Sequence, residues 1–522
     1  MLLTGAALLL HLLWPLVLVS RVESTLPRLS ARLGKEVTVV QVEPVAWGGV
    51  RLLGLRIDSG VEGAPPLLEV PVAELTIAPW EVLLGWVRPL SIEVDIPRFQ
   101  VRGRSLEHEP PVELAGRLQG SLRLQARGAR RPFDATFSLA ELSVSHPKLA
   151  AEAVQVRALG LSARGAISWP LKSLELEALE LELGHLRARL SGRVDGLERA
   201  EALWLEARLE LLRAPCQLLL ESLPREALPA LQGFKLAGEL AGWMELTVRP
   251  YSPETLTLNM DVPGEGCTVL EAPPRASAER LRQPFEQVIA EVPSRTLVLG
   301  PASGSFVPLD DVSPWAVNAV LVAEDRWFFR HRGMVLFSVQ QALVRNLVAG
   351  EFKLGASTIS MQLARNLLLD RKKNLLRKFQ ELVLAWHLEK SLSKERILEL
   401  YLNVVELGPG LYGIGPAAGY YFGKPASSLE PLEGAFLAHL LPAPKPRHAR
   451  ACEPWDEQRL APLERIVADV LSTDRGFTHK YKQERLLVES WGGATRQPPR
   501  FGQGRACRSG AGPSPGAASG PP

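Results

Sequence analysis

The sequence predicts a multidomain protein of α and β structure, with an N-terminal transmembrane helix, an antiparallel β-rich half and a mainly α-helical domain. Residues 2–20 carry no charge, and about 20 apolar helical residues cross a bilayer. Between residues 36 and 248, short runs place apolar side chains at every second position, the period of half-buried strands. Beyond about residue 300 the apolar period becomes helical.

The amino-acid composition limits the number of domains and the kinds of partner that the protein can have. The chain has 522 residues, of which 46% are hydrophobic, enough for two to four domains of about 100 to 200 residues each. Lys and Arg number 60 against 57 for Asp and Glu, a net charge of +3. This balance argues against nucleic acid as a partner.

The N-terminal apolar run is predicted to be a membrane anchor. It is longer than the usual h-region of 7 to 15 residues, and no A-x-A cleavage site follows it. A cleaved signal peptide remains the alternative. Arg21 and Arg28 follow the run and no basic residue precedes it, so charge does not fix the orientation.

The β-rich half is predicted from alternating runs at residues 36–43, 91–96 and 205–211. Residues 174–183 (LELEALELEL) are strong helix formers, yet only a strand collects their glutamates on one face. The alternation slips at Ala178 and Leu179, which indicates a bulge or two separate strands.

Residues 35–58 and 92–102, together with the anchor, resemble the AsmA/TamB-like proteins of Gram-negative envelopes. The resemblance implies an extended antiparallel sheet curved into an apolar groove. A generic β spacer between the membrane and the C-terminal domain is the alternative. On the groove interpretation, we expect residues 21–248 to fold alone and to co-purify with phospholipid, and a fragment of about residues 277–448 to be active without them.

The four cysteines, Cys216, Cys267, Cys452 and Cys507, allow three pairings and have no metal-ligand spacing. Unpaired thiols are the expectation. In an oxidising compartment Cys452 and Cys507, which flank the C-terminal extension, are the first pair to test.

Chemistry-bearing motifs lie in the helical segment. Ser313 and Pro314 predict a helix start, and this helix ends at Glu324 and Asp325. The motif GASTISMQLARN (355–366) then places Ser357 at a helix N-cap, where free N–H groups suit an anion. Beside and after Ser357 come Thr358, Gln362, Arg365 and Asn366. A further helix sets Arg377 and Glu381 four residues apart on one face, beside Lys373 and Lys378.

These motifs in this order, with residues 394–403 (KERILELYLN), resemble glycosyltransferase family 51, the polymerising domains of class A penicillin-binding proteins and of monofunctional transglycosylases. The resemblance implies a lysozyme-like fold, with an apolar jaw at residues 334–337 and 347–352 that enters the bilayer. It also implies polymerisation of lipid II into β-1,4-linked glycan, with release of undecaprenyl pyrophosphate.

The resemblance assigns roles by position. Glu324 is the general base, and Glu381 orients the cations or a divalent metal. The substrate-binding residues are Asp325, Ser357, Thr358, Gln362, Arg365, Asn366, Lys373, Arg377 and Lys378, and the basic ones among them hold the pyrophosphate. No cofactor is expected to be essential; Mg²⁺ or Mn²⁺ at Glu381 stays open. Val335, Met361 and Arg365 depart from the family's usual residues, which puts rate and substrate preference in question.

The expected partners are lipid II, the nascent glycan chain and the bilayer, and binding of transpeptidases stays open. The expected location is the inner membrane, with a single span and a periplasmic catalytic domain. The predicted domains are 1–20 (anchor), 25–250 (β-rich), 251–299 (linker with a short helix), 300–450 (glycosyltransferase), 451–496 (C-terminal extension) and 497–522 (disordered tail).

Two other functions and two other motifs are less consistent with the sequence. A lysozyme-like lytic transglycosylase would not need the basic cluster, and a non-enzymatic lipid-binding scaffold would not need both glutamates. Ser391 and Lys394 fit an SxxK motif, but no KTG follows, and we expect no transpeptidase domain. His331 has no second ligand nearby, so it is predicted to be a structural hydrogen bonder.

Overall fold

The computed structural model describes residues 17–31, 35–45, 49–58, 66, 68–77, 89–102, 112–125, 129–168, 172–262, 266–289, 292–349, 355–369, 374–451 and 457–472. Within these ranges no helix combines the length and the apolar character needed to cross a bilayer. Most of the predicted anchor, residues 1–16, lies outside them, as does the tail at 497–522.

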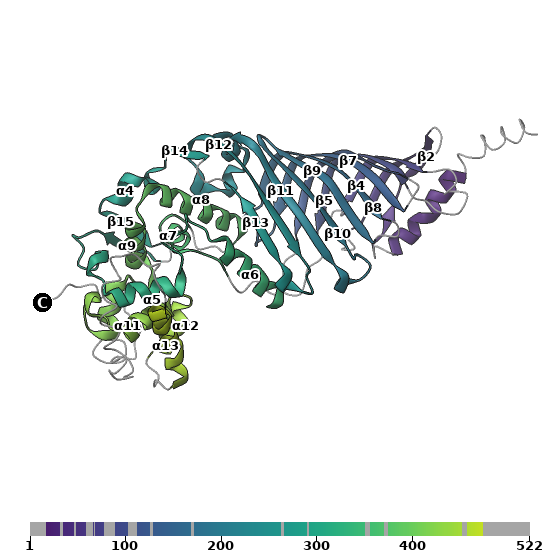
Figure 1. The fold of residues 1–522 in the computed structure, drawn as a ribbon. Helices are drawn as coiled ribbons and strands as arrows, with labels where there is room; N and C mark the ends of the chain where they lie inside the picture. Colours follow the sequence, from purple (N-terminus) through teal and green to yellow (C-terminus); the bar gives the residue numbers. More distant parts are fainter. Residues whose placement is uncertain are drawn as a thin grey trace, which may run out of the picture.

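The N-terminal half is one long antiparallel sheet (Figure 1). Its described strands run in the order β1-β3-β4 and then consecutively to β13, with β2 beside β3 and β14 beside β12. The strands are β1 (Val37–Thr38), β2 (Gln41–Val45), β3 (Gly49–Ile57), β4 (Leu68–Ile77), β5 (Pro89–Arg102), β6 (Glu113–Leu124), β7 (Arg130–Ser145), β8 (Val154–Ser168), β9 (Ser173–Leu183), β10 (Leu186–Asp195), β11 (Trp204–Pro215), β12 (Lys235–Val248), β13 (Thr257–Asp261) and β14 (Cys267–Glu271).

One face of this sheet is apolar in register from β3 to β13. Residues directly opposite each other share a face, so one line of paired residues can be followed across all these strands. We call this line the central rung. It consists of Val50, Leu75, Ile92, Leu122, Ala135, Ala163, Leu179, Leu190, Leu209, Met244 and Met260.

The opposite face is charged. Arg51 pairs with Glu74 at 2.7 Å and Arg189 with Glu180 at 2.8 Å, each across neighbouring strands. Residues 173–183 form a single strand whose register slips against β10 opposite residues 177–178. The predicted strand is confirmed, and its irregularity is a bulge.

Both ends of the apolar face are covered. Residues 17–31 are helical, and Leu18 and Val22 pack with Val50 and Leu52 at the β3 end. The helix therefore continues past the predicted anchor boundary at residue 20. At the β13 end the face packs against α6 (Leu336–Ala349).

The C-terminal half is mainly helical, as predicted. It begins with α4 (Ala278–Arg282) and the hairpin β15 (Phe285–Ile289) and β16 (Val292–Leu299). Its other helices and short strands are α5 (Pro314–Glu324), α6, α7 (Ile359–Leu368), α8 (Leu375–Ser391), α9 (Lys394–Val404), β17 (Glu406–Gly408), β18 (Leu411–Tyr412), α10 (Ile414–Phe422), α11 (Pro431–Leu440), α12 (Pro444–Ala449) and α13 (Glu457–Ser472).

The two halves share one core and direct hydrogen bonds. Leu231 and Phe234, which precede β12, belong to the same buried cluster as the helices, and so does Leu463 of α13. The backbone N–H of Leu375 donates to the carbonyl of Lys148 at 2.8 Å. The sheet also extends through β13 and β14 into the predicted linker 251–299, so the predicted boundaries at 250 and 450 cut through packed structure.

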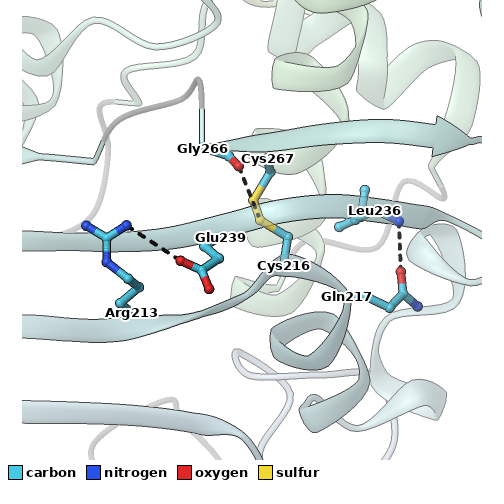
Figure 2. Close-up of a disulfide and its surroundings, with 7 residues drawn as sticks. All are labelled: Arg213, Cys216, Gln217, Leu236, Glu239, Gly266 and Cys267. Carbon is cyan, nitrogen blue, oxygen red and sulfur yellow. Dashed lines mark hydrogen bonds and ion pairs between the residues drawn. A yellow bond between two sulfur atoms is a disulfide. The ribbon is translucent and has the colours of Figure 1, made fainter.

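A disulfide joins Cys216, at the start of α3 (Cys216–Ser222), to Cys267 of β14 (Figure 2). This corrects the expectation of unpaired thiols. The two cysteines are 51 residues apart in sequence, and the pairing of β12 with β14 helps to bring them together. Cys452 and Cys507 lie outside the described residues.

Candidate active site

Glu324 ends α5 and is held by a chain of hydrogen bonds. Nε2 of Gln362 donates to Oε2 of Glu324 at 2.7 Å, and the hydroxyl of Tyr401 donates to Oε1 of Gln362 at 3.2 Å. Tyr401 is fully buried on α9. Because the tyrosine hydroxyl supplies a donor, the Gln362 amide is oriented with its NH₂ group toward Glu324.

The pKa of Glu324 is raised above its ordinary value, mainly because burial penalises the carboxylate. The hydrogen bond from Gln362 and the charges of Arg365 and Arg447 oppose this rise, whereas the neighbouring Asp325 adds to it. A carboxylate with a raised pKa is a stronger base than an exposed one once it is ionised.

Arg447 is a site residue that the sequence did not reveal. It lies on α12, near the end of the predicted domain. Its guanidinium donates to the carbonyl of His439, and its charge acts on Glu324. It stands in a proline-containing segment that matches no motif, so only the fold identifies it.

A second cluster lies on the first turns of α8. Asn374 caps this helix by accepting from the N–H of Arg377 at 2.8 Å. Glu381 is fully buried, and its two oxygens accept from Arg377 and from Lys378, the latter at 2.6 Å. Lys378 also donates to Oγ of Ser357 at 2.6 Å. The predicted Arg377 and Glu381 pair is therefore confirmed as a contact.

Burial lowers the pKa values of the two cations in this cluster. It lowers the pKa of Lys378 to about 8, with smaller contributions from the charges of Arg365 and Arg377. It also lowers the pKa of Arg377, again helped by Arg365. Arg365 on α7 thus acts electrostatically on Glu324 and on both cations of α8. The acid and the cationic cluster form one electrostatic site.

The start of α7 differs from the prediction. Its N-cap is Thr358, not Ser357: Oγ1 of Thr358 accepts from the N–H of Met361 at 3.3 Å and donates to the carbonyl of Gly333 at 2.6 Å. The N–H of Ile359 donates to Oδ2 of Asp325 at 3.0 Å. These groups of the helix start are bonded within the protein, so they are not the predicted free anion-binding groups.

Asp325 and His331 hold the loop that follows α5. Asp325 is buried, and its Oδ2 lies 2.8 Å from Nε2 of His331, whose Nδ1 accepts from the N–H of Gly333 at 3.0 Å. Gly333 has φ +98°, a conformation that disfavours other residues. His331 is structural, as predicted, and Asp325 has the same structural task instead of an open substrate-binding position.

The described residues contain no group of three or more His, Cys, Asp or Glu side chains arranged to hold a metal ion. Both oxygens of Glu381 are engaged by cations, so a divalent ion does not fit this carboxylate as it stands. Asn366 lies half-buried on α7, and Lys373 lies outside the described residues.

The SxxK residues do not form a nucleophile and base pair. Oγ of Ser391 lies 3.2 Å from Nδ1 of His387, whereas Nζ of Lys394 donates to Glu389 at 2.7 Å. The rejection of this motif is consistent with these contacts.

Comparison with known proteins places the site in a family. Residues 293–467 match the Transglycosylase family model. The biosynthetic peptidoglycan transglycosylase of Acinetobacter baumannii (strain SDF) is 46% identical over 145 residues, which cover 28% of this chain and 64% of the relative. Enzymes of the same name from Paraburkholderia xenovorans and Burkholderia thailandensis are 43% and 42% identical over 155 and 165 residues, covering 30% and 32% of this chain.

The chain spans 64–65% of the length of these relatives, less than two thirds. The family model lies in the C-terminal half, so the resemblance of residues 25–250 to AsmA/TamB-like proteins stays a prediction. Residues 293–467 of this chain are a transglycosylase domain of glycosyltransferase family 51.

Proposed function

We propose that the protein is a peptidoglycan glycosyltransferase that polymerises lipid II into β-1,4-linked glycan strands and releases undecaprenyl pyrophosphate. The observation that carries the proposal is the pairing of two features in one site. Glu324 is a half-buried carboxylate of raised pKa that accepts from Gln362, and the charge of Arg365 acts both on it and on the cations held by Glu381.

Glu324 acts as the general base. Its carboxylate takes the proton of the acceptor's sugar 4-hydroxyl while the hydroxyl oxygen attacks the anomeric carbon of the donor. The bond from this carbon to the pyrophosphate breaks, and the electron pair leaves with the phosphate oxygen. Attack opposite to an α-linked leaving group gives a β-linked product, so the reaction inverts configuration.

Arg365, Arg377 and Lys378 stabilise the leaving pyrophosphate. Charged nitrogen donors form strong hydrogen bonds with phosphate oxygens, and fixed donors need little reorganisation during the reaction. Glu381 holds Arg377 and Lys378 side by side, so its task is to position them. Lys373, on the approach to α8, is proposed to add a further positive charge.

The proposed location is the inner membrane, with the catalytic domain on the periplasmic side. The Cys216–Cys267 disulfide is typical of an oxidising compartment, and the uncharged residues 2–20 fit a single-pass anchor. Phe337 and Val348 on α6 are 63% and 70% exposed, which suits a jaw that enters the bilayer. The proposed partners are the bilayer and the nascent glycan, with transpeptidases as consumers of the product.

Replacement of the base tests this proposal. Glu324→Gln keeps the size of the side chain but cannot accept the proton, so polymerisation of labelled lipid II should fall by a factor of about 10² to 10⁴. Circular dichroism should show an unchanged fold. Glu457→Gln, an exposed change at the start of α13, is the matched control and should polymerise like the wild type. Wild-type rates in Glu324→Gln would refute the assignment of the base.

A further inference from the structure

Among the residues that the structure describes, nothing covers the middle of the sheet's apolar face. Leu179 and Leu190 are only half-buried there, and Leu209 is 39% exposed. Among the described residues, the helices that pack on this face do so near its two ends, through Leu18 and Val22 at one end and through α6 at the other. A row of apolar side chains between two covered ends needs a partner to exclude water.

The α6 end of this face leads directly to the catalytic loop. Leu336 and Leu343 of α6 pack in one cluster with Val248 and Leu258 of the sheet. The helix begins three residues after Gly333, which lies in the loop after Glu324. Gly333 is hydrogen-bonded to Thr358 at the start of α7 and to His331 within this loop. The apolar surface of the sheet and the active site therefore meet through a single helix.

A second contact brings the cationic cluster to the same sheet. The turn between β7 and β8 accepts hydrogen bonds from Leu375 and Leu376 at the start of α8, through the carbonyls of Lys148 and Leu149. Arg377 and Lys378 follow immediately on this helix. A ligand with an apolar tail on the sheet can thus place an anionic head group near both the cations and Glu324.

The shape and chemistry of the face fit a long hydrocarbon chain. Ten inter-strand spacings separate β3 from β13, a path of about 48 Å at the usual strand spacing. That path is longer than the roughly 30 Å hydrocarbon core of a bilayer. The central rung carries no polar side chain, and the ion pairs of the opposite face keep that side in water.

Resting on the proposed function, we propose that the open apolar face between the 17–31 helix and α6 binds the polyprenyl chain of the lipid-linked donor and guides its pyrophosphate to Arg377 and Lys378. Phospholipid is the less favoured occupant because Glu381 holds two cations side by side at the start of α8, which suits the higher negative charge of a pyrophosphate. The exposed side chains Phe337, Leu347 and Val348 of α6 give the chain a route from the bilayer.

Donors of different chain length test this proposal separately from the catalytic one. Leu190→Gln puts an amide in the middle of the central rung, whereas Arg189→Gln changes the neighbouring residue on the charged face. With the natural long-chain donor, kcat/KM of Leu190→Gln should fall about tenfold relative to Arg189→Gln. With a water-soluble short-chain donor, the two variants should be equal.

The possible results separate the two proposals. Equal kcat/KM of both variants with the long-chain donor would overturn the binding of the chain while leaving the catalytic function intact. A wild-type protein that polymerises neither donor would overturn the catalytic function on which this inference rests.

Photo-crosslinking keeps the test independent of folding defects. A photoreactive amino acid at Leu209 should label the polyprenyl chain of the donor in the full-length protein in membranes, and the same amino acid at Glu210, on the other face, should not. Labelling of phospholipid alone, of a second copy of the chain, or of nothing at Leu209 would each overturn the assignment of the occupant.

Discussion

At the scale of single residues, the protonation of Glu324 depends on the direction of one amide. Gln362 can donate to Glu324 only while its oxygen faces the other way, and the hydroxyl of Tyr401 holds that oxygen. The hydrogen bond from Gln362 lowers the pKa of Glu324 against the effect of burial. Tyr401 is therefore a positioning residue, acting on the base through Gln362.

Removal of the tyrosine hydroxyl should shift the pH dependence of catalysis. In Tyr401→Phe the Gln362 amide is free to turn its oxygen toward Glu324, which raises the pKa of the base further. We expect the acid limb of kcat/KM to move to higher pH, with a loss of about 2- to 10-fold at neutral pH.

Tyr421→Phe is the matched control for this change. Tyr421 is also fully buried, and its hydroxyl donates to the carbonyl of Leu407 at 2.8 Å. Its removal should lower stability and leave the acid limb in place. An unmoved acid limb in Tyr401→Phe would show that the tyrosine is merely structural.

The alkaline limb of activity should belong to Lys378. Its pKa is lowered to about 8, so its charge is complete below that pH and is lost as the pH rises through it. Polymerisation should therefore decline above about pH 8 in the wild type. Lys378→Arg retains the charge and should keep its activity to higher pH, even if its maximal rate is lower. The same alkaline limb in both proteins would contradict this origin.

At the scale of helices and strands, the disulfide fastens α3 to the short edge strand β14 (Figure 2). It closes a loop of 51 residues that contains β12 and β13. A crosslink of this length mainly restricts the unfolded chain.

Cys216→Ser with Cys267→Ser should lower the free energy of unfolding by about 2 to 4 kcal/mol. The measurement is the Tm of the variant beside that of the wild type with and without reductant. Reductant should lower the Tm of the wild type toward that of the variant and leave the variant unchanged. A wild-type Tm that does not respond to complete reduction would contradict a stabilising bond.

The hydrophobic periodicity of the sequence predicted strands and helices correctly where burial of one apolar face decides the structure. Period-two runs such as 205–211 became strands because an antiparallel sheet buries one face, and the helix start at Ser313 lies where expected. Predictions of helix caps from neighbouring residues failed where the capping side chain bonds to a residue far away in the sequence. The hydroxyl of Ser313 donates to Leu429 instead of capping its own helix, and Thr358 displaces Ser357 because Gly333 accepts from it.

The site residues that lie within sequence motifs could be predicted from the sequence. Glu324 and Gln362 share a hydrogen bond, and Arg377, Lys378 and Glu381 meet because three- and four-residue spacings place them on one face of α8. Arg447 and Tyr401 were not assigned to the base, since their proximity to Glu324 depends on how α9 and α12 pack. The Cys216–Cys267 pair was missed for the same reason: sheet pairing, not sequence distance, sets it.

At the scale of the whole molecule, the β12 and β14 end of the sheet shares a buried core with the helical domain (Figure 1). The N–H of Ala230 donates to Oε1 of the buried Gln380 at 2.9 Å, joining the sheet half to α8. Leu463 and Val467 of α13 complete the helical core. The transglycosylase domain therefore depends on residues outside the boundaries that its motifs mark.

This shared core revises the expectation for an isolated fragment. Residues 277–448 lack Leu231, Phe234 and Leu463, and loss of such buried side chains costs about 2 to 5 kcal/mol each. We expect this fragment to be unfolded or aggregated, and residues 200–472 to retain more structure. Circular dichroism and thermal melting of both fragments make the comparison. A cooperative melt of 277–448 at the temperature of the full-length protein would show that the halves are independent.

The most direct test of the central claim is the direction in which glycan length changes. The full-length protein is incubated with labelled lipid II together with separately labelled, preformed glycan, and both labels are followed on a gel over time. The lipid II label should move into progressively longer chains, and the preformed glycan should not be shortened. Shortening of the preformed glycan without incorporation of lipid II would instead identify a lytic enzyme and contradict the proposed function.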